Sequence, residues 1–224
     1  MFRIPQYELR MPKRLCEWFL ILSASWTLVS CEGRTSRGNR LVIKHGSTPI
    51  IDGILSSDEW KDAESVRIGV EQGWTVEVFY KHDGSNLYIA FSNLIRKDRA
   101  IYPEVLLDIA NGKTSSWNSD DWWFHTSYND CEGKGVYCVY TFGNDGSCQK
   151  DHGDWAANNF PLNQGIIEIK IPYSKIGLIP SQGKTVGIAF DVTNATTKWY
   201  LWPAAAQLES PSTWAEATSS DEWK

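Results

Sequence analysis

The chain has 224 residues, of which 42% are hydrophobic and 22% are charged, and its formal net charge is -5. This length suffices for one well-packed domain of ordinary size. The negative charge, without any basic block in the sequence, argues against nucleic acid as a partner. Tryptophan occurs 12 times, which leaves core and ligand-stacking roles both open, because the indole ring serves in either.

The N-terminal segment has the pattern of a secretory signal. A positive start at 11–14 is followed by a largely apolar run at 18–29, and the sequence Leu-Val-Ser-Cys ends at Cys31. We therefore predict a signal peptide over 1–30, since the apolar run is too short to span a membrane comfortably. The ending is similar to the bacterial lipoprotein box, which implies that Cys31 is lipidated. The alternative is an ordinary signal peptide in which this cysteine is incidental.

Residues 32–40 are rich in Gly, Ser and Arg, and we predict that they form a flexible tether. A lipid on Cys31 would hold the following domain close to a membrane. We therefore expect an exported protein that is lipid-anchored to the bacterial cell envelope, on the periplasmic or the surface face of the outer membrane.

Residues 41–224 read as a single domain of many short strands. Strands are expected at 40–44, 66–70, 75–80, 87–93, 103–109, 121–128, 136–142, 165–171, 186–193 and 199–202. Short helical turns are expected at 56–63 and 173–178, and the chain beyond Pro203 reads as irregular. This pattern predicts an all-β fold: an antiparallel β-sandwich, jelly-roll or immunoglobulin-like, with one or two short helical turns.

Two neighbouring strands carry acids beside aromatic residues. The strand at 103–109 contains Glu104, and the strand after the next polar loop contains Trp122, Trp123 and His125. Because successive side chains on a strand point to opposite faces, one of the two tryptophans should be buried. The other, Trp123, should share a face with His125.

The order of short motifs in the chain resembles the family 9 carbohydrate-binding modules. The motifs that carry the resemblance lie at 49–53, 58–60, 86–90, 104–121, 168–172 and 187–191. The resemblance extends from about residue 41 to residue 215. It implies a non-catalytic β-sandwich with a mono- or oligosaccharide as its partner.

Members of that family clamp a terminal sugar between two tryptophans, and an acid and a cation nearby bind its hydroxyls. The acid matches Glu104, and the place of the cation is taken by His125, which is usually neutral at pH 7. Tyr102 is the only aromatic residue where the first clamp tryptophan would lie, and 205–208 offers none for the second. Other tryptophans are therefore expected to stack on the sugar.

The sequence thus predicts a carbohydrate-binding lipoprotein domain without catalytic activity. The expected ligand-binding residues are Tyr102, Glu104, Trp117, Trp123, His125, Trp155 and Trp202. Trp60, Trp74 and Trp199 are expected in the core. The chain has no Gly-rich phosphate loop and no nucleophile elbow. The alternatives are an envelope structural or protein-interaction domain on the same fold and, less favoured because no methionine follows Cys31, a haem-binding relative.

An acidic loop suggests a structural calcium ion, the one cofactor considered. Its hard oxygen ligands would come from Asp108, Asn111, Asp120 and Asp121. The spacing is not that of an EF-hand, and the alternative is a solvated acidic loop. The four histidines lack the spacing of a zinc site.

Three cysteines remain in the expected mature domain, Cys131, Cys138 and Cys148. Outside the cytoplasm they allow one disulfide and one free thiol. All three pairings stay open.

Overall fold

The computed structural model describes residues 39–97, 99–127, 138–142, 148–149, 155–157, 165–194 and 198–224. All of them belong to one compact unit, Ser36–Lys224. The predicted signal peptide over 1–30, Cys31 and most of the predicted tether lie outside the described residues. Within the described part of the chain, no helix has the length and apolar character needed to cross a membrane.

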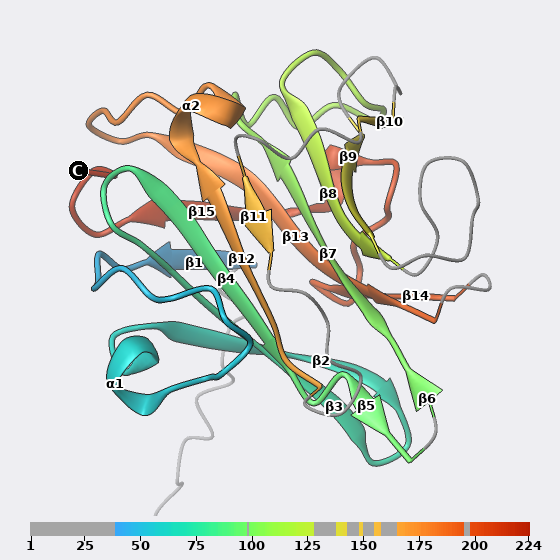
Figure 1. Cartoon of the computed structure of the whole chain (residues 1–224). Helices are drawn as coiled ribbons and strands as arrows, with labels where there is room; N and C mark the ends of the chain where they lie inside the picture. Colours follow the sequence, from blue (N-terminus) through green and yellow to red (C-terminus); the bar gives the residue numbers. More distant parts are fainter. Residues whose placement is uncertain are drawn as a thin grey trace, which may run out of the picture. The chain divides into compact units, whose positions relative to one another are not determined.

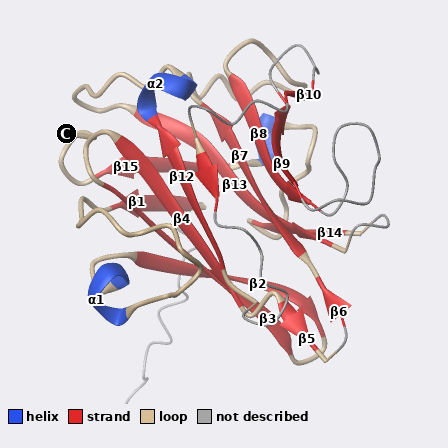
Figure 2. Cartoon of the chain, viewed as in Figure 1, coloured by secondary structure: helices blue, strands red, loops and turns tan. Residues whose placement is uncertain are grey.

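Two main β-sheets make up the unit (Figures 1 and 2). The eight-stranded sheet contains β1 (Arg40–Ile43), β7 (Tyr102–Asp108), β8 (Asp121–Ser127), β9 (Cys138–Phe142), β10 (Cys148–Gln149), β13 (Thr185–Thr193), β14 (Trp199–Trp202) and β15 (Ala215–Ser219). Its order is β1-β15-β13-β7-β8-β9-β10, and β14 also pairs with β13. All of these pairs are antiparallel except β1 with β15, which is parallel.

The five-stranded sheet has the order β11-β12-β4-β3-β2. Its strands are β2 (Glu64–Glu71), β3 (Trp74–His82), β4 (Asn86–Ser92), β11 (Ala156–Ala157) and β12 (Ile167–Pro172). A separate ribbon joins β5 (Ile95–Arg96) to β6 (Arg99–Ala100). The helical pieces are single turns: α1 (Ser57–Trp60), α2 (Tyr173–Ile176) and a 3-10 turn at Pro211–Thr213. The predicted all-β sandwich with short helical turns is confirmed.

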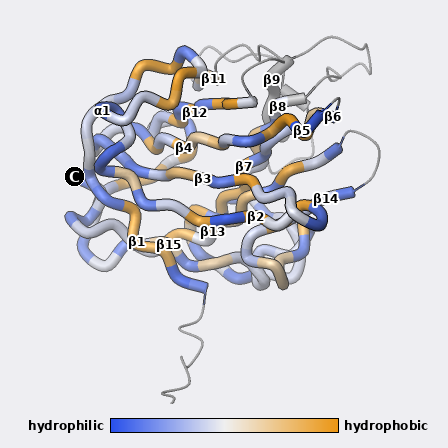
Figure 3. Tube along the Cα trace, turned by 90° about the horizontal axis from the view of Figure 1, so that it is seen from below, coloured by the Kyte–Doolittle hydropathy of each residue, from blue (hydrophilic) through white to orange (hydrophobic). Residues whose placement is uncertain are grey.

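The core lies between the two sheets and follows from alternation along the strands. On β3, Val76, Val78 and Tyr80 are buried, whereas Thr75 is exposed. Figure 3 shows hydrophobic and hydrophilic segments alternating along the strands. β7 differs, because all seven of its residues are buried, so this strand is covered on both faces.

The expectation of an irregular chain beyond Pro203 is wrong, because β15 forms there and fills the place between β1 and β13. Ala215 and Ala217 face the core, and Glu216 lies between them in the strand. Two alanines give a weak hydrophobic signal, and alanine is depleted in strands. Long-range pairing therefore decides the structure of this segment.

A buried carboxylate fastens the segment around α1 onto the five-stranded sheet. Glu168 on β12 has no exposed surface. It accepts hydrogen bonds from the backbone N–H of Asp52 (3.0 Å) and of Gly53 (2.7 Å) and from Trp60 Nε1 (2.7 Å). The motifs at 49–53 and 58–60 therefore have a structural role, since they supply the donors that a buried carboxylate requires.

Substitution of Trp60 by phenylalanine tests this role. The change removes one donor to a buried carboxylate, so we expect a loss of about 1–3 kcal/mol in the free energy of unfolding, measured by urea denaturation. Trp199→Phe is the matched control, because Trp199 is 45% exposed, and it should leave the stability nearly unchanged. Equal stability of the two variants would contradict the assignment.

Candidate functional site

The outer face of the eight-stranded sheet, which points away from the five-stranded sheet, carries a row of polar residues. Asp191 on β13 pairs with Glu104 on β7, and Glu104 pairs with His125 on β8. Val105 and Leu107, the intervening residues of β7, face the main core, so Glu104 points outward. Asp191, Glu104 and His125 are called the acid row below.

The side chains of the acid row are buried and joined to one another. Exposure is 2% for Glu104, 4% for His125 and 0% for Asp191. His125 Nδ1 lies 2.8 Å from Glu104 Oε1, and Trp123 Nε1 donates to Glu104 Oε2 at 2.9 Å. Asp191 Oδ1 accepts the backbone N–H of Tyr200 at 3.0 Å. Asp191 Oδ2 is also buried, and the neighbouring carboxyl group of Glu104 acts on the pKa of Asp191 through its charge and a hydrogen bond.

Burial controls the charge of this row. It raises the pKa of Glu104 to about 7. Burial, followed by repulsion from Glu104, raises the pKa of Asp191 well above its ordinary value. Burial also lowers the pKa of His125 well below its ordinary value, so the neutral ring donates Nδ1–H to Glu104. In the described part of the chain, no Lys or Arg forms an ion pair with Glu104 or Asp191.

On one side of the acid row lies an aromatic cluster formed by Trp117, Trp123 and Trp214. The ring centroids of Trp117 and Trp123 are 5.9 Å apart and nearly parallel, and Trp214 meets Trp117 edge-on at 5.4 Å. Trp117 and Trp123 are partly exposed, whereas Trp214 is buried. Trp123 also contacts His125, with 3.9 Å between ring centroids. The structure therefore brings Trp117, Trp123, Glu104 and His125 together, as the sequence predicted.

On the other side of the acid row lies Trp199. Trp199 pairs with Thr193 on β13, and Thr193 pairs with Tyr102 on β7. This row lies two residues along the strands from the pair of Asp191 and Glu104. Trp199 is 45% exposed, so the expectation that it is a core residue is wrong. Tyr102 lies on the same face but is buried, with 8% exposure.

Sequence reasoning missed Trp199 and Asp191 as site residues. β14 reads Trp-Tyr-Leu-Trp, so no polar residue indicates which side of the strand is buried. Tyr200 packs against the core, which turns Trp199 outward. The presence of an acid in the largely apolar strand β13 could have indicated Asp191 as a site residue.

Two predicted ligand-binding tryptophans lie in the wrong place for this site. Trp155 is 4% exposed and meets Phe124 edge-on at 5.1 Å within the main core. Trp202 packs against the same core, 6.0 Å from the ring of Phe190. The expectation that Trp155 stacks on a ligand is therefore wrong. Trp202 is partly exposed but lies away from the acid row, and its expected role stays a prediction. Trp122 packs against the core as alternation predicted.

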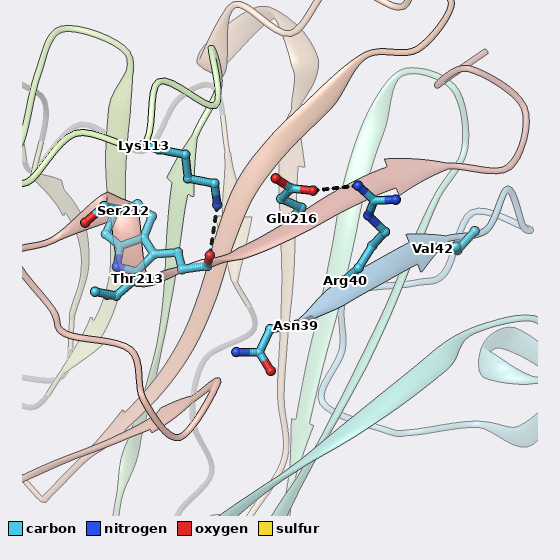
Figure 4. Close-up of a pocket in the computed structure, with 8 residues that line it drawn as sticks. Asn39, Arg40, Val42, Lys113, Ser212, Thr213 and Glu216 are labelled. Atoms are coloured by element: carbon cyan, nitrogen blue, oxygen red, sulfur yellow. Dashed lines mark hydrogen bonds and ion pairs between the residues drawn. The ribbon is translucent and has the colours of Figure 1, made fainter. Parts of the chain in front are cut away.

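A cavity of about 800 Å³ opens over β1 and β15 (Figure 4). Its lining comprises Asn39, Arg40, Val42, Lys113, Ser212, Thr213, Trp214 and Glu216. Lys113 Nζ donates to the carbonyl oxygen of Trp214 at 2.9 Å, and Arg40 pairs with Glu216 at 2.8 Å. Lys113, Arg40 and Glu216 are thus already engaged within the protein, and Trp214 is 3% exposed. We therefore place the candidate ligand site at the acid row.

The structure brings three of the predicted calcium ligands together. Oxygens of Asp108, Asp120 and Asp121 lie within 4.8 Å of one another. Asp108 and Asp121 have no exposed surface, whereas Asp120 is partly exposed, so both the calcium site and the solvated acidic loop stay predictions. Cys131 lies outside the described residues, and the disulfide stays a prediction.

No protein-family model and no curated protein matches the sequence. The solved structures that resemble the fold include two carbohydrate-binding modules of family 9 from Caldicellulosiruptor kristjanssonii. The module in complex with cellotriose has a TM-score of 0.56 and 17% identity, and the match covers 80% of this chain and 93% of that chain. The module in complex with glucose has a TM-score of 0.54 and 19% identity, with 80% and 95% coverage. The chain therefore has the family 9-like β-sandwich fold.

The raised pKa of Glu104 predicts a pH dependence of stability. The folded protein holds this proton more tightly than the unfolded chain, because the pKa rises from 4.5 to about 7. The contribution of Glu104 to stability should therefore be greatest below pH 4.5 and be lost as the pH rises to about 7. The raised pKa of Asp191 acts in the same direction, whereas the lowered pKa of His125 acts in the opposite one. Glu104→Gln should reduce this loss of stability, which amounts to a few kcal/mol at about 1.4 kcal/mol per pKa unit.

Thermal unfolding between pH 4 and pH 8 measures the effect. Glu209→Gln is the matched control, since Glu209 is exposed, and it should follow the unsubstituted protein. If Glu104→Gln kept the full pH dependence, Glu104 would not be its source.

Proposed function

We propose that this protein is a non-catalytic carbohydrate-binding domain that holds a saccharide over the acid row. The observation that carries the proposal is the arrangement of this row, which lies between the exposed Trp199 and the partly exposed Trp117 and Trp123. A sugar ring has apolar faces that stack on indoles and a polar edge that requires hydrogen bonds. The outer face of the eight-stranded sheet offers both kinds of contact side by side.

The acid row supplies the polar half of this site. The carboxyl groups of Glu104 and Asp191 offer oxygens that can exchange hydrogen bonds with sugar hydroxyls, and such bonds are strong in a buried setting. His125 Nε2 is buried and has no hydrogen-bond partner among the described residues, and a sugar hydroxyl would supply one. Because the row is at most 4% exposed, a sugar reaches it only after the covering groups move aside.

The similar solved structures indicate which sugars to test first. One family 9 module was solved with cellotriose and the other with glucose. We therefore propose glucose and β-linked gluco-oligosaccharides as the first ligands. We propose no hydrolysis, because Glu104 and Asp191 are adjacent buried residues on paired strands and do not flank a cleft as glycosidase acids do.

A second candidate is an envelope structural or protein-interaction domain without sugar binding. The observation in its favour is the packing of the outer face itself. Leu106, Ala189 and Trp214 are buried there, and Trp117 and Trp123 pack against them. Such a cluster resembles a second small core as much as a stacking platform.

Calorimetry separates these two candidates. Titration of glucose, cellotriose and a wider glycan panel should give heat of binding for at least one sugar. Trp199→Ala should weaken that binding about tenfold, equivalent to about 1.4 kcal/mol, because it removes an exposed stacking face. Ile179→Ala, which truncates an apolar side chain that is 75% exposed, should bind normally. A folded protein that binds no sugar would overturn the proposal and favour the second candidate.

We also propose that Cys31 carries a lipid that anchors the domain to the bacterial cell envelope. The support is the sequence before it, an apolar run ending in Leu-Val-Ser-Cys. The expected tether then leaves the domain free to meet polysaccharides near the membrane.

Substitution of Cys31 by serine tests the anchor. The unsubstituted protein should sediment with membranes and incorporate a labelled fatty acid, and Cys31→Ser should do neither. Cys16→Ser is the matched control, because Cys16 lies before the apolar run, and it should keep both properties. Unchanged labelling of Cys31→Ser would refute the lipid anchor.

A further inference from the structure

A second, smaller cavity opens at one end of the sandwich. Its volume is about 210 Å³. Figure 1 shows the ribbon of β5 and β6 beside the ends of β2 and β3 at this end of the unit. The residues that line it include Glu71, Trp74, Arg99, Ile101, Asn194 and Tyr200. This cavity is called the end pocket.

The end pocket adjoins the proposed sugar site. Three of its lining residues are direct chain neighbours of the row that joins Trp199 to Tyr102, namely Ile101, Asn194 and Tyr200. Successive residues of a strand point to opposite sides of the sheet, so the same short segments supply both the outer face and the end pocket. A saccharide of more than one unit that stacks on Trp199 therefore lies close to the end pocket.

The walls of the end pocket are largely aromatic. Trp74 is 2% exposed, and the guanidinium of Arg99 lies 5.3 Å from the centroid of its ring. Tyr200 is partly exposed, and the ammonium of Lys198 lies 4.7 Å from its ring centroid. A partly exposed aromatic ring offers a stacking surface to the apolar face of a sugar. Cavities for drug-sized ligands span about 300–1,000 Å³, so the end pocket suits a single sugar unit.

Positive charge predominates around the end pocket. Arg99 donates to both oxygens of Glu71, at 3.2 and 2.5 Å, and Tyr200 Oη donates to Glu71 at 3.3 Å. The hydrogen bond from Arg99 is the main cause that lowers the pKa of Glu71, and the charge of Lys198 adds to it. One ionised carboxylate thus faces two cations.

Lys198 is the cation available to a ligand. It is exposed, and within the described part of the chain it forms no ion pair with a carboxylate. Its ammonium has three N–H donors, and a carboxylate is a strong acceptor for such donors. The acid row has the opposite character, because Glu104 and Asp191 are both acids there.

We propose that the end pocket is a second subsite of the saccharide site and takes a sugar unit that carries a carboxylate, a uronic acid. The inference rests on the proposed carbohydrate binding. The ligand carboxylate binds the ammonium of Lys198, with added attraction from Arg99, while the sugar ring stacks on Tyr200. A uronic acid differs from the neutral hexose only in the oxidation of its terminal carbon, so it fits where the neutral unit fits. The subsite therefore favours acidic over neutral glycans.

The test compares two disaccharides by calorimetry on the full chain. Cellobiose is neutral, and cellobiouronic acid carries glucuronic acid in place of one glucose unit. Cellobiouronic acid should bind about tenfold more tightly. Added sodium chloride should reduce this preference, because exposed charges are screened by salt.

Two substitutions should move the preference in opposite directions. In Lys198→Gln the affinities for the two disaccharides should become equal, because the cation that binds the carboxylate is gone. In Glu71→Gln the preference for cellobiouronic acid should increase, because the competing carboxylate is removed. Lys61→Gln is the matched control, since Lys61 is exposed beyond the end of α1, and it should keep the tenfold preference.

The outcomes separate this inference from the proposed function. Equal binding of the two disaccharides by the unsubstituted protein would overturn the subsite and leave carbohydrate binding standing. A preference that survives in Lys198→Gln would overturn the subsite as well. Absence of binding for both disaccharides, cellotriose and the wider glycan panel would overturn the proposed function, and the subsite with it.

Discussion

Burial of carboxylates is the constraint on which this structure depends. β7 is covered on both faces, yet its outward positions include Glu104 and Asp108, and a buried carboxylate is stable only with donors, a cation or a proton. Glu168 on the opposite sheet receives three N–H donors and needs nothing more from outside. The acid row receives fewer hydrogen-bond donors than its buried carboxyl groups require. The difference separates Glu168, which fastens the fold, from the acids on the outer face of the eight-stranded sheet, where we propose that a ligand binds.

The two outer faces of the sandwich are closed in different ways. Over the five-stranded sheet, Trp60 packs with Tyr88 and Ala90, and Lys81 reaches Asp62 at 2.8 Å, so charge and hydrogen bonding balance within the protein. Over the eight-stranded sheet, tryptophans from two loops cover apolar residues, but the polar groups beside them remain incompletely bonded. The outer face of the five-stranded sheet therefore serves stability, and the outer face of the eight-stranded sheet is the one on which we propose binding.

Local alternation predicted much of the sandwich and part of the site. It placed Trp123 beside His125 and Trp122 toward the core, because the polar residues of β8 indicated which alternate positions of the strand face outward. Alternation failed for Trp199, because β14 consists of four consecutive aromatic or aliphatic residues and none of them indicates which side is exposed. The polar residues that flank Trp155 suggested that it is exposed, whereas its side chain is buried in the core between the sheets. The position of Asp191 beside Glu104 follows from pairing between distant strands, which no local pattern contains.

The parallel pairing of β1 with β15 has a consequence for the order in which the molecule assembles. Arg40 and Glu216, which form an ion pair across these strands, are 176 residues apart in the chain. A contact of such sequence separation carries a large loop-closure entropy and forms slowly. During synthesis from the N-terminus, β1 cannot pair with β15 until β15 has been made. Until then the edges of β1 and β13 stay open to other chains, so the newly made protein needs protection that the finished one does not.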